Sequence, residues 1–97
     1  MMDIFGTKTF RMTDSLEEQS MATMKEAAEL WQAVRWYERN LVTDPERAAD
    51  VLLHAIDEGA DVIQTVLNAF AMMGMNEEDV EDAMFRCLCR NEIRGRV

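Results

Sequence analysis

The sequence predicts an all-α protein, and three observations support this fold class. Only four glycines and one proline are present among the 97 residues, which leaves few breaks for the many turns of a β architecture. Hydrophobic residues make up 48% of the chain, which is ample for a folded domain. The length suits a single core. We therefore expect a short leader over residues 1–13 and one helical domain over residues 14–97.

The first helix is expected from about residue 16 to residue 39. Ser15 followed three residues later by Glu18 forms a capping box, and Asn40 is a plausible stop. The leader before it holds scattered apolar residues without a helical period. It is therefore either a flexible arm or an extended segment packed on a neighbour.

The second helix is expected over residues 45–73. Asp44 can cap its start, the following proline suits a first helical turn, and Gly74 is a natural residue after the last turn. Gly59 is a weak point in the middle, so this helix could be kinked or split just before Asp57.

The third helix is expected from Asn76, which can cap it, to about Arg94. Two long helices and one of medium length do not readily cover all their apolar faces. We therefore expect three main helices per chain and a four-helix-bundle-like core that is completed by oligomerisation. A homodimer or a homotetramer would meet this need.

The charge and the apolar runs exclude several classes of protein. Ten basic and 19 acidic side chains give a net charge of −9, which repels phosphate backbones and argues against general nucleic-acid binding. No secretory signal is recognisable and no apolar run is long enough to span a membrane. Cys87 and Cys89 have no partner cluster, so we interpret them as free thiols of a cytoplasmic protein.

Four carboxylates stand out by their position on the expected helices. Glu26 and Glu29 share one side of the first helix, whereas Glu58 lies on the apolar stripe of the second helix with Asp61 at its flank. Charges on a stripe that faces the core are costly unless they are compensated, and no Lys or Arg there could neutralise all four. Ligand sets made only of oxygen favour Mg²⁺, with Mn²⁺ as an alternative.

These pairs resemble the motifs of a known family. Glu26 and Glu29, followed by Glu58 and Asp61, are similar to the metal-binding motifs of the MazG-like nucleoside triphosphate pyrophosphohydrolases, which are all-α enzymes. The segment over residues 90–96 resembles the Asn-plus-basic stretch that closes the family's domain. The resemblance covers about residues 20–96, and it departs from the family at Lys25, where relatives often carry another acid.

The resemblance implies hydrolysis of a nucleoside triphosphate to a monophosphate and pyrophosphate. It implies that the four carboxylates hold Mg²⁺, which neutralises charge on the phosphate oxygens. We expect Glu29 and Glu58 to be the catalytic residues, with Glu29 orienting or deprotonating the attacking water. Candidates for binding the substrate are Tyr37 for the base and Arg90, Asn91 and Arg94 for the phosphate tail.

Several residues have a second interpretation. Trp31 and Trp36 could stack on a base, although large aromatic residues on a helix more often serve packing, and Tyr37 is favoured because it shares the carboxylate face. His54 lies one turn before Glu58 and is either a structural histidine or a residue that supports the ligands.

Two other functions are compatible with the sequence. One is a non-catalytic acidic helical adaptor or regulator, and the other is a degenerate family member that binds nucleotide or metal without turnover. The placement of the four carboxylates discriminates between the first of these and an enzyme. An adaptor requires them to be exposed, whereas an enzyme requires them to converge in a cleft.

Overall fold

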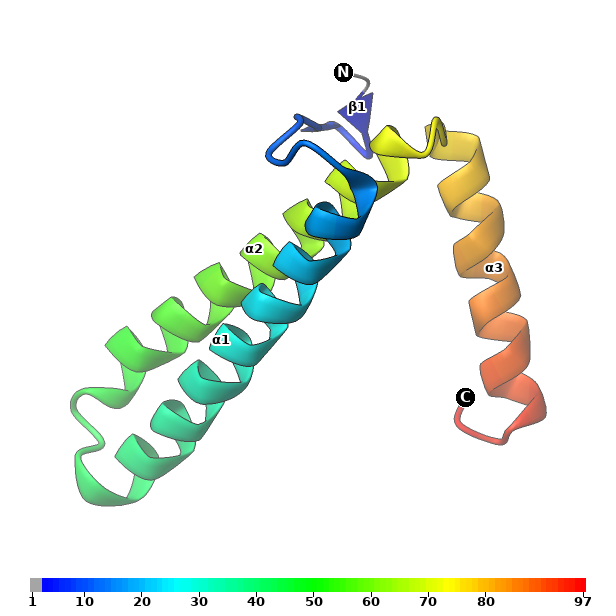
Figure 1. Cartoon of the computed structure of the whole chain (residues 1–97). Coiled ribbons are helices and arrows are strands. Elements are labelled where there is room, and N and C mark those ends of the chain that lie inside the picture. Colours follow the sequence, from blue (N-terminus) through cyan, green and yellow to red (C-terminus); the bar gives the residue numbers. More distant parts are fainter. Residues whose placement is uncertain (1–2) are drawn as a thin grey trace.

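The computed structural model describes residues 3–97, which form two short strands and three helices (Figure 1). Strands β1 (Asp3–Ile4) and β2 (Thr7–Lys8) pair antiparallel and precede helices α1 (Leu16–Thr43), α2 (Ala48–Met72) and α3 (Glu77–Ile93). Helices α1 and α2 lie side by side as a hairpin, whereas α3 leaves the end of α2 at an angle and runs along neither helix. The prediction of an all-α chain with three helices is confirmed.

Within the described part of the leader, residues 3–8 form a β-hairpin that packs on the helices of the same chain. Phe5 and Gly6 join the strands with positive φ angles of 53° and 72°, the pattern of a type I′ turn. This turn directs Ile4 inward, where it is completely buried against Leu67 of α2 and Val80 of α3.

Two side chains of α2 hold the leader in place. Gln64 Nε2 donates a hydrogen bond to the carbonyl of Lys8 at 3.0 Å. The buried Asn68 accepts another from the Phe10 amide at 3.0 Å through its Oδ1. The leader therefore belongs to the fold of the helices and is not a separate arm.

Helix α1 begins as predicted and ends later than predicted. The Ser15 hydroxyl accepts a hydrogen bond from the Glu18 amide, which forms the expected N-cap. Asn40 does not stop the helix, because its side-chain amide donates to the carbonyl of Trp36, one turn earlier, at 2.8 Å. The helix continues to Thr43, so the predicted end at residue 39 is wrong.

The connection between α1 and α2 also differs from the prediction. Asp44 does not cap α2; its amide donates to the Asn40 carbonyl and closes the last turn of α1. Pro45 lies in the intervening turn, and α2 begins after Arg47 without a side-chain cap. Helix α2 is not split at its middle, because Gly59 continues the helix and faces Leu30 of α1.

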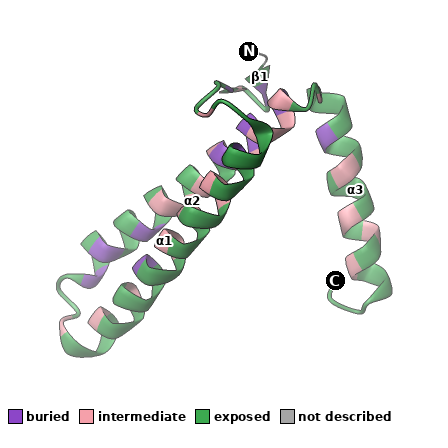
Figure 2. Ribbon diagram, in the orientation of Figure 1, coloured by how far each residue is buried: buried purple, intermediate pink, exposed green. Residues whose placement is uncertain are grey.

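Small side chains dominate the seam between α1 and α2. Ala33 of α1 and Val51, Ala55 and Thr65 of α2 are buried along this seam. Figure 2 shows buried residues along the two paired helices and a largely exposed α3. Small residues in a helix interface let the helix axes approach closely, which brings longer side chains at its edges within reach of one another.

Candidate metal centre

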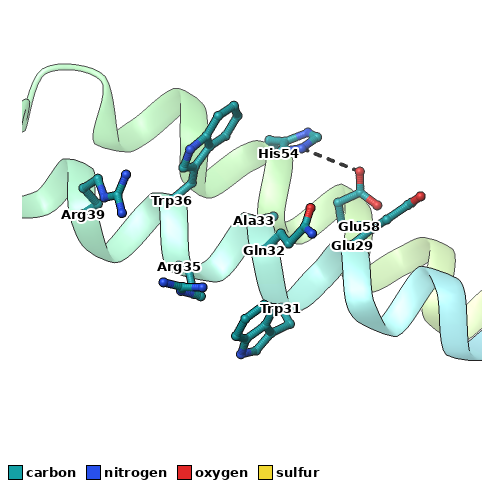
Figure 3. Close-up of a pocket in the computed structure, with 9 residues that line it drawn as sticks. All are labelled: Glu29, Trp31, Gln32, Ala33, Arg35, Trp36, Arg39, His54 and Glu58. Carbon is teal, nitrogen blue, oxygen red and sulfur yellow. Dashed lines mark ion pairs between the residues drawn. The ribbon is translucent and has the colours of Figure 1, made fainter.

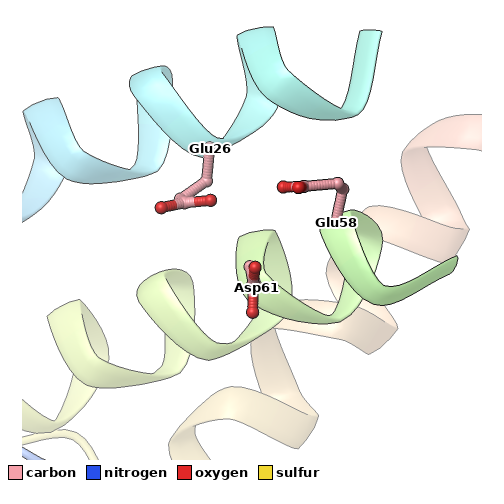
Figure 4. Close-up of side chains that lie close together, drawn as sticks. All are labelled: Glu26, Glu58 and Asp61. Carbon is pink, nitrogen blue, oxygen red and sulfur yellow. The ribbon is translucent and has the colours of Figure 1, made fainter. Parts of the chain in front are cut away.

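Three carboxylates from α1 and α2 converge at the edge of this seam. Glu26, Glu58 and Asp61 each place one oxygen within 4.8 Å of the others (Figure 4). Glu58 and Asp61 lie three residues apart and so share one face of α2, and Glu26 reaches them from α1. Glu26 and Glu58 are half-buried, and Asp61 is exposed.

Two oxygens of this cluster lack the partners that burial requires. Glu26 Oε2 and Glu58 Oε2 are buried, and neither has a hydrogen-bond donor within residues 3–97. A buried carboxylate oxygen without a hydrogen-bond donor costs free energy of folding. The only ion pair of the cluster within the described residues joins His54 Nε2 to the other oxygen of Glu58, Oε1, at 3.6 Å. The cluster therefore fits a cation that would supply the missing positive charge.

The pKa of Glu26 reflects the same crowding. Desolvation, a side-chain hydrogen bond with Glu29, and the negative charges of Glu29, Asp61 and Glu58 raise the pKa of Glu26 above its ordinary value. A divalent cation bound to these oxygens would oppose this shift, because it favours the charged carboxylate. An oxygen-only ligand set of this kind suits the hard cation Mg²⁺.

Glu29 joins the cluster in a different way from the other three carboxylates. Its negative charge contributes to the raised pKa of Glu26, and it contributes no oxygen to the group that lies within 4.8 Å. All four predicted carboxylates thus lie in one region, with three in position to share an ion and Glu29 beside them.

A groove of about 450 Å³ opens next to the carboxylates. Glu29 and Glu58 line the groove, and Figure 3 shows both at the end of the labelled residues opposite Arg39. The residues that line it come mostly from α1: Glu29, Trp31, Gln32, Ala33, Arg35, Trp36 and Arg39, with His54 and Glu58 from α2. The groove therefore offers aromatic, amide and cationic groups within a short distance of the acidic cluster.

Tyr37, the residue favoured for base stacking, does not line the groove. It is half-buried on α1, and Trp31 and Trp36 line the groove in its place. The Arg35 guanidinium stacks over Trp31 at 4.8 Å from the ring centroid. Successive residues of a helix are turned by 100°, so Trp36 and Tyr37 point in clearly different directions.

Arg90 and Asn91 lie on α3 and Arg94 caps its C-terminal end, so none of the three is brought to the carboxylates within one chain (Figure 1). The Asn91 amide donates to the carbonyl of Cys87 at 3.0 Å, and its Oδ1 accepts from Arg96 at 3.2 Å. Arg90 and Arg94 are exposed.

Gln32, Arg35 and Arg39 are groove residues that the sequence interpretation missed. Gln32 lies three residues after Glu29, and Arg39 lies ten residues after it. At 100° per residue these positions fall on the same side of the helix. This periodicity was a usable signal, because it extends the helix face that carries Glu29 toward the end of α1.

Comparison with known proteins gives no further identification. No family model matches the chain, and neither the curated proteins nor the solved structures contain a significant match to it. Among the helices of residues 3–97, none combines the length and apolar character needed to cross a bilayer.

Proposed function

We propose that this protein is a Mg²⁺-dependent pyrophosphohydrolase that converts nucleoside triphosphates to monophosphates and pyrophosphate. The proposal depends on one observation: Glu26, Glu58 and Asp61 converge within 4.8 Å although two of their oxygens are buried without a donor. An adaptor that used its acids only for solubility would gain nothing from this costly arrangement. The resemblance to the MazG-like enzymes supplies the reaction class.

The roles of the carboxylates follow from their positions. Glu26, Glu58 and Asp61 would hold the cation, with Mn²⁺ as an alternative to Mg²⁺. The bound ion would neutralise negative charge on the phosphate oxygens during hydrolysis. Glu29 contributes no oxygen to the converging group and also lines the groove, so it is the carboxylate best placed to orient or deprotonate a water molecule.

The groove would bind the nucleotide. Trp36 replaces Tyr37 as the aromatic candidate for contact with the base, because it lines the groove and Tyr37 does not. Arg35 and Arg39 line the groove and have no ion pair with any residue of the described chain, although Arg35 stacks on Trp31, so both would offer positive charge to the substrate. In a protein with a net charge of −9, these cations offset repulsion of a polyanionic ligand.

Arg90, Asn91 and Arg94 keep their proposed role at the phosphate tail only if they reach the groove from another chain. Helix α3 of the same chain points away from α1 and α2 (Figure 1). We therefore propose that the enzyme is a homodimer or homotetramer in which α3 of one copy approaches the groove of another.

The proposed function is tested by measuring pyrophosphate and orthophosphate release from a panel of canonical and modified nucleoside triphosphates with Mg²⁺. We expect pyrophosphate from at least one of them, and we expect Glu58→Gln to abolish its release. Glu81→Gln, which removes an exposed carboxylate of α3, is the matched control and should retain activity.

Two outcomes would contradict this function. Full activity of Glu58→Gln would show that the carboxylate cluster is not the active site. Mg²⁺ binding without pyrophosphate from any nucleotide would instead identify a degenerate, non-catalytic member of the family.

A further inference from the structure

A smaller hollow continues the groove toward the turn between α1 and α2. It measures about 170 Å³ and is lined by Trp36 of α1 and by Arg47, Asp50, Val51 and His54 at the start of α2. Trp36 and His54 also line the groove, so the two spaces are adjacent (Figure 3). We call the smaller space the end pocket. Sites for whole ligands measure about 300–1,000 Å³, so the end pocket has the size of a subsite within the larger groove.

The end pocket lies along the side of α2 that carries Glu58. Glu58, His54 and Asp50 are spaced at intervals of four residues, which places them along one face of the helix. At a rise of about 1.5 Å per residue, Asp50 lies about 12 Å from Glu58 along the helix axis. A nucleotide whose phosphates are held beside Glu58 would therefore extend its base toward Asp50.

Two opposite charges line the end pocket without neutralising each other. Within residues 3–97, the side chains of Arg47 and Asp50 form no ion pair and no hydrogen bond. A guanidinium offers several N–H donors in one plane, and a carboxylate offers two acceptor oxygens. The end pocket therefore presents a donor group and an acceptor group to a ligand, next to the buried Val51.

The charge of Asp50 indicates which part of a nucleotide enters the end pocket. A carboxylate repels a phosphate, whereas Mg²⁺ bound at Glu26, Glu58 and Asp61 would attract the phosphates to the other part of the groove. The end pocket is thus suited to the uncharged base, and Trp36 offers an aromatic surface for stacking.

The hydrogen-bonding groups of the end pocket match guanine better than the other bases. Guanine presents two adjacent donors, N1–H and the N2 amino group, and two acceptors, O6 and N7. One guanine can therefore satisfy both oxygens of Asp50 and two donors of Arg47. Adenine, cytosine and uracil each offer a carboxylate only one donor group, which leaves one of its oxygens unpaired.

We propose that the end pocket selects guanine nucleotides. Asp50 accepts hydrogen bonds from N1–H and the N2 amino group, and Arg47 donates to O6 and N7. This inference rests on the proposed function for the position of the phosphates, and it deepens that function by naming the base.

Equilibrium binding measures base selection without turnover. The probes are the α,β-methylene analogues of GTP, ATP, CTP and UTP, titrated calorimetrically in the presence of Mg²⁺. We expect the guanine analogue to bind about 10-fold or more tightly than the others, because a bidentate contact discriminates by about 5- to 150-fold. Equal affinity for the four analogues, no binding of any of them, or a preference for another base would overturn the proposal.

Asp50→Asn should change which base is preferred. The asparagine carbonyl still accepts from N1–H, but its amide opposes the N2 amino group of guanine and can instead donate to O2 of xanthine. We expect about 10-fold or more weaker binding of the guanine analogue and tighter binding of the corresponding xanthine analogue. An acid in the first turn also stabilises a helix. A lower melting temperature with an unchanged ratio of guanine to xanthine affinity would assign Asp50 to that role alone and overturn the proposal.

Two further variants complete the test. Arg47→Met should weaken binding of the guanine and xanthine analogues alike, because both bases carry O6 and N7. Asp57→Asn is the matched control, since it removes an exposed carboxylate of α2 that lines neither the groove nor the end pocket, and it should keep the guanine preference.

Base selection and catalysis can fail separately. Pyrophosphate release without a base preference would overturn this inference and leave the proposed function intact. Guanine-selective binding without pyrophosphate release would support this inference and contradict only the proposed catalysis.

Discussion

Glu26 lies one turn before Glu29 on α1, and the pKa of Glu26 is raised above its ordinary value. Desolvation is the largest cause, followed by the closeness of Glu29 and the negative charges of Asp61 and Glu58. A divalent cation that binds this cluster would therefore compete with protonation of Glu26.

The metal-free protein should lose stability as the pH rises. A carboxyl group whose pKa is higher in the folded state binds its proton more tightly when folded. Its stabilising contribution is complete below the ordinary pKa of about 4.5 and is lost as the pH rises through the higher pKa of the folded state. Urea unfolding in the presence of a chelator should show this decline. Glu26→Gln should make the free energy of unfolding depend less on pH, whereas Glu81→Gln should leave the pH dependence unchanged. An equal dependence on pH in the parent and both variants would show that Glu26 does not cause the decline.

Mg²⁺ should stabilise the folded chain. A ligand at 100 times its dissociation constant adds about 2.7 kcal/mol, which for a domain of this size raises the melting temperature by about 10 °C or more. Differential scanning calorimetry with and without Mg²⁺ measures the shift. Asp61→Asn removes the charge of an exposed ligand and should reduce the shift without affecting the fold. A parent protein that melts at the same temperature with and without Mg²⁺ would rule out the metal centre.

Gly59→Ala should stabilise the protein. A Cβ at this position would lie 3.8 Å from Leu30 Cδ1, which is an ordinary van der Waals contact, and the backbone there is helical. Replacing a glycine inside a helix by alanine gains about 0.5–1 kcal/mol. Urea titration should show a higher midpoint at an unchanged slope, and a lower midpoint would mean that the seam has no room for the methyl group.

Ile4→Ala should destabilise the corner between α2 and α3. Truncation of a buried isoleucine costs about 2–5 kcal/mol, and Ile4 is completely buried against Leu67 and Val80. Hydrogen exchange should show the loss most strongly in the first turns of α3. Phe5→Ala, at the exposed neighbouring position, is the control and should leave the protection of α3 near that of the parent. Equal protection of α3 in Ile4→Ala would show that the helix caps alone hold the corner.

Local signals predicted most of the helical structure. The Ser15 and Asn76 caps and the Gly74 terminus depend on nearby residues, and all three are present. The predicted helix end at Asn40 was wrong because the side-chain amide of an asparagine can also donate to the carbonyl one turn earlier, and the helix then continues.

The site was predictable only where helix periodicity decides it. Glu26 and Glu58 lie on the facing stripes of two adjacent helices, so their proximity follows from the pattern of apolar residues. The direction of α3 does not follow from local patterns alone. It depends on the turn at Gly74 and also on contacts between Ile4, Leu67 and Val80, and Ile4 is far from the other two in the sequence. This direction decides whether Arg90 and Arg94 can reach the carboxylates.

The alanines of the α1–α2 seam have a role that reaches beyond packing. Ala33 and Ala55 are buried between the helices, so the spacing of the helix axes depends on how little room their methyl groups occupy. A valine at either site would increase the distance between the axes of α1 and α2, and with it the distance between the carboxylates of Glu26 and Glu58. Discrimination between a small ion such as Mg²⁺ and a larger one such as Ca²⁺ would then be governed by residues that never touch the ion.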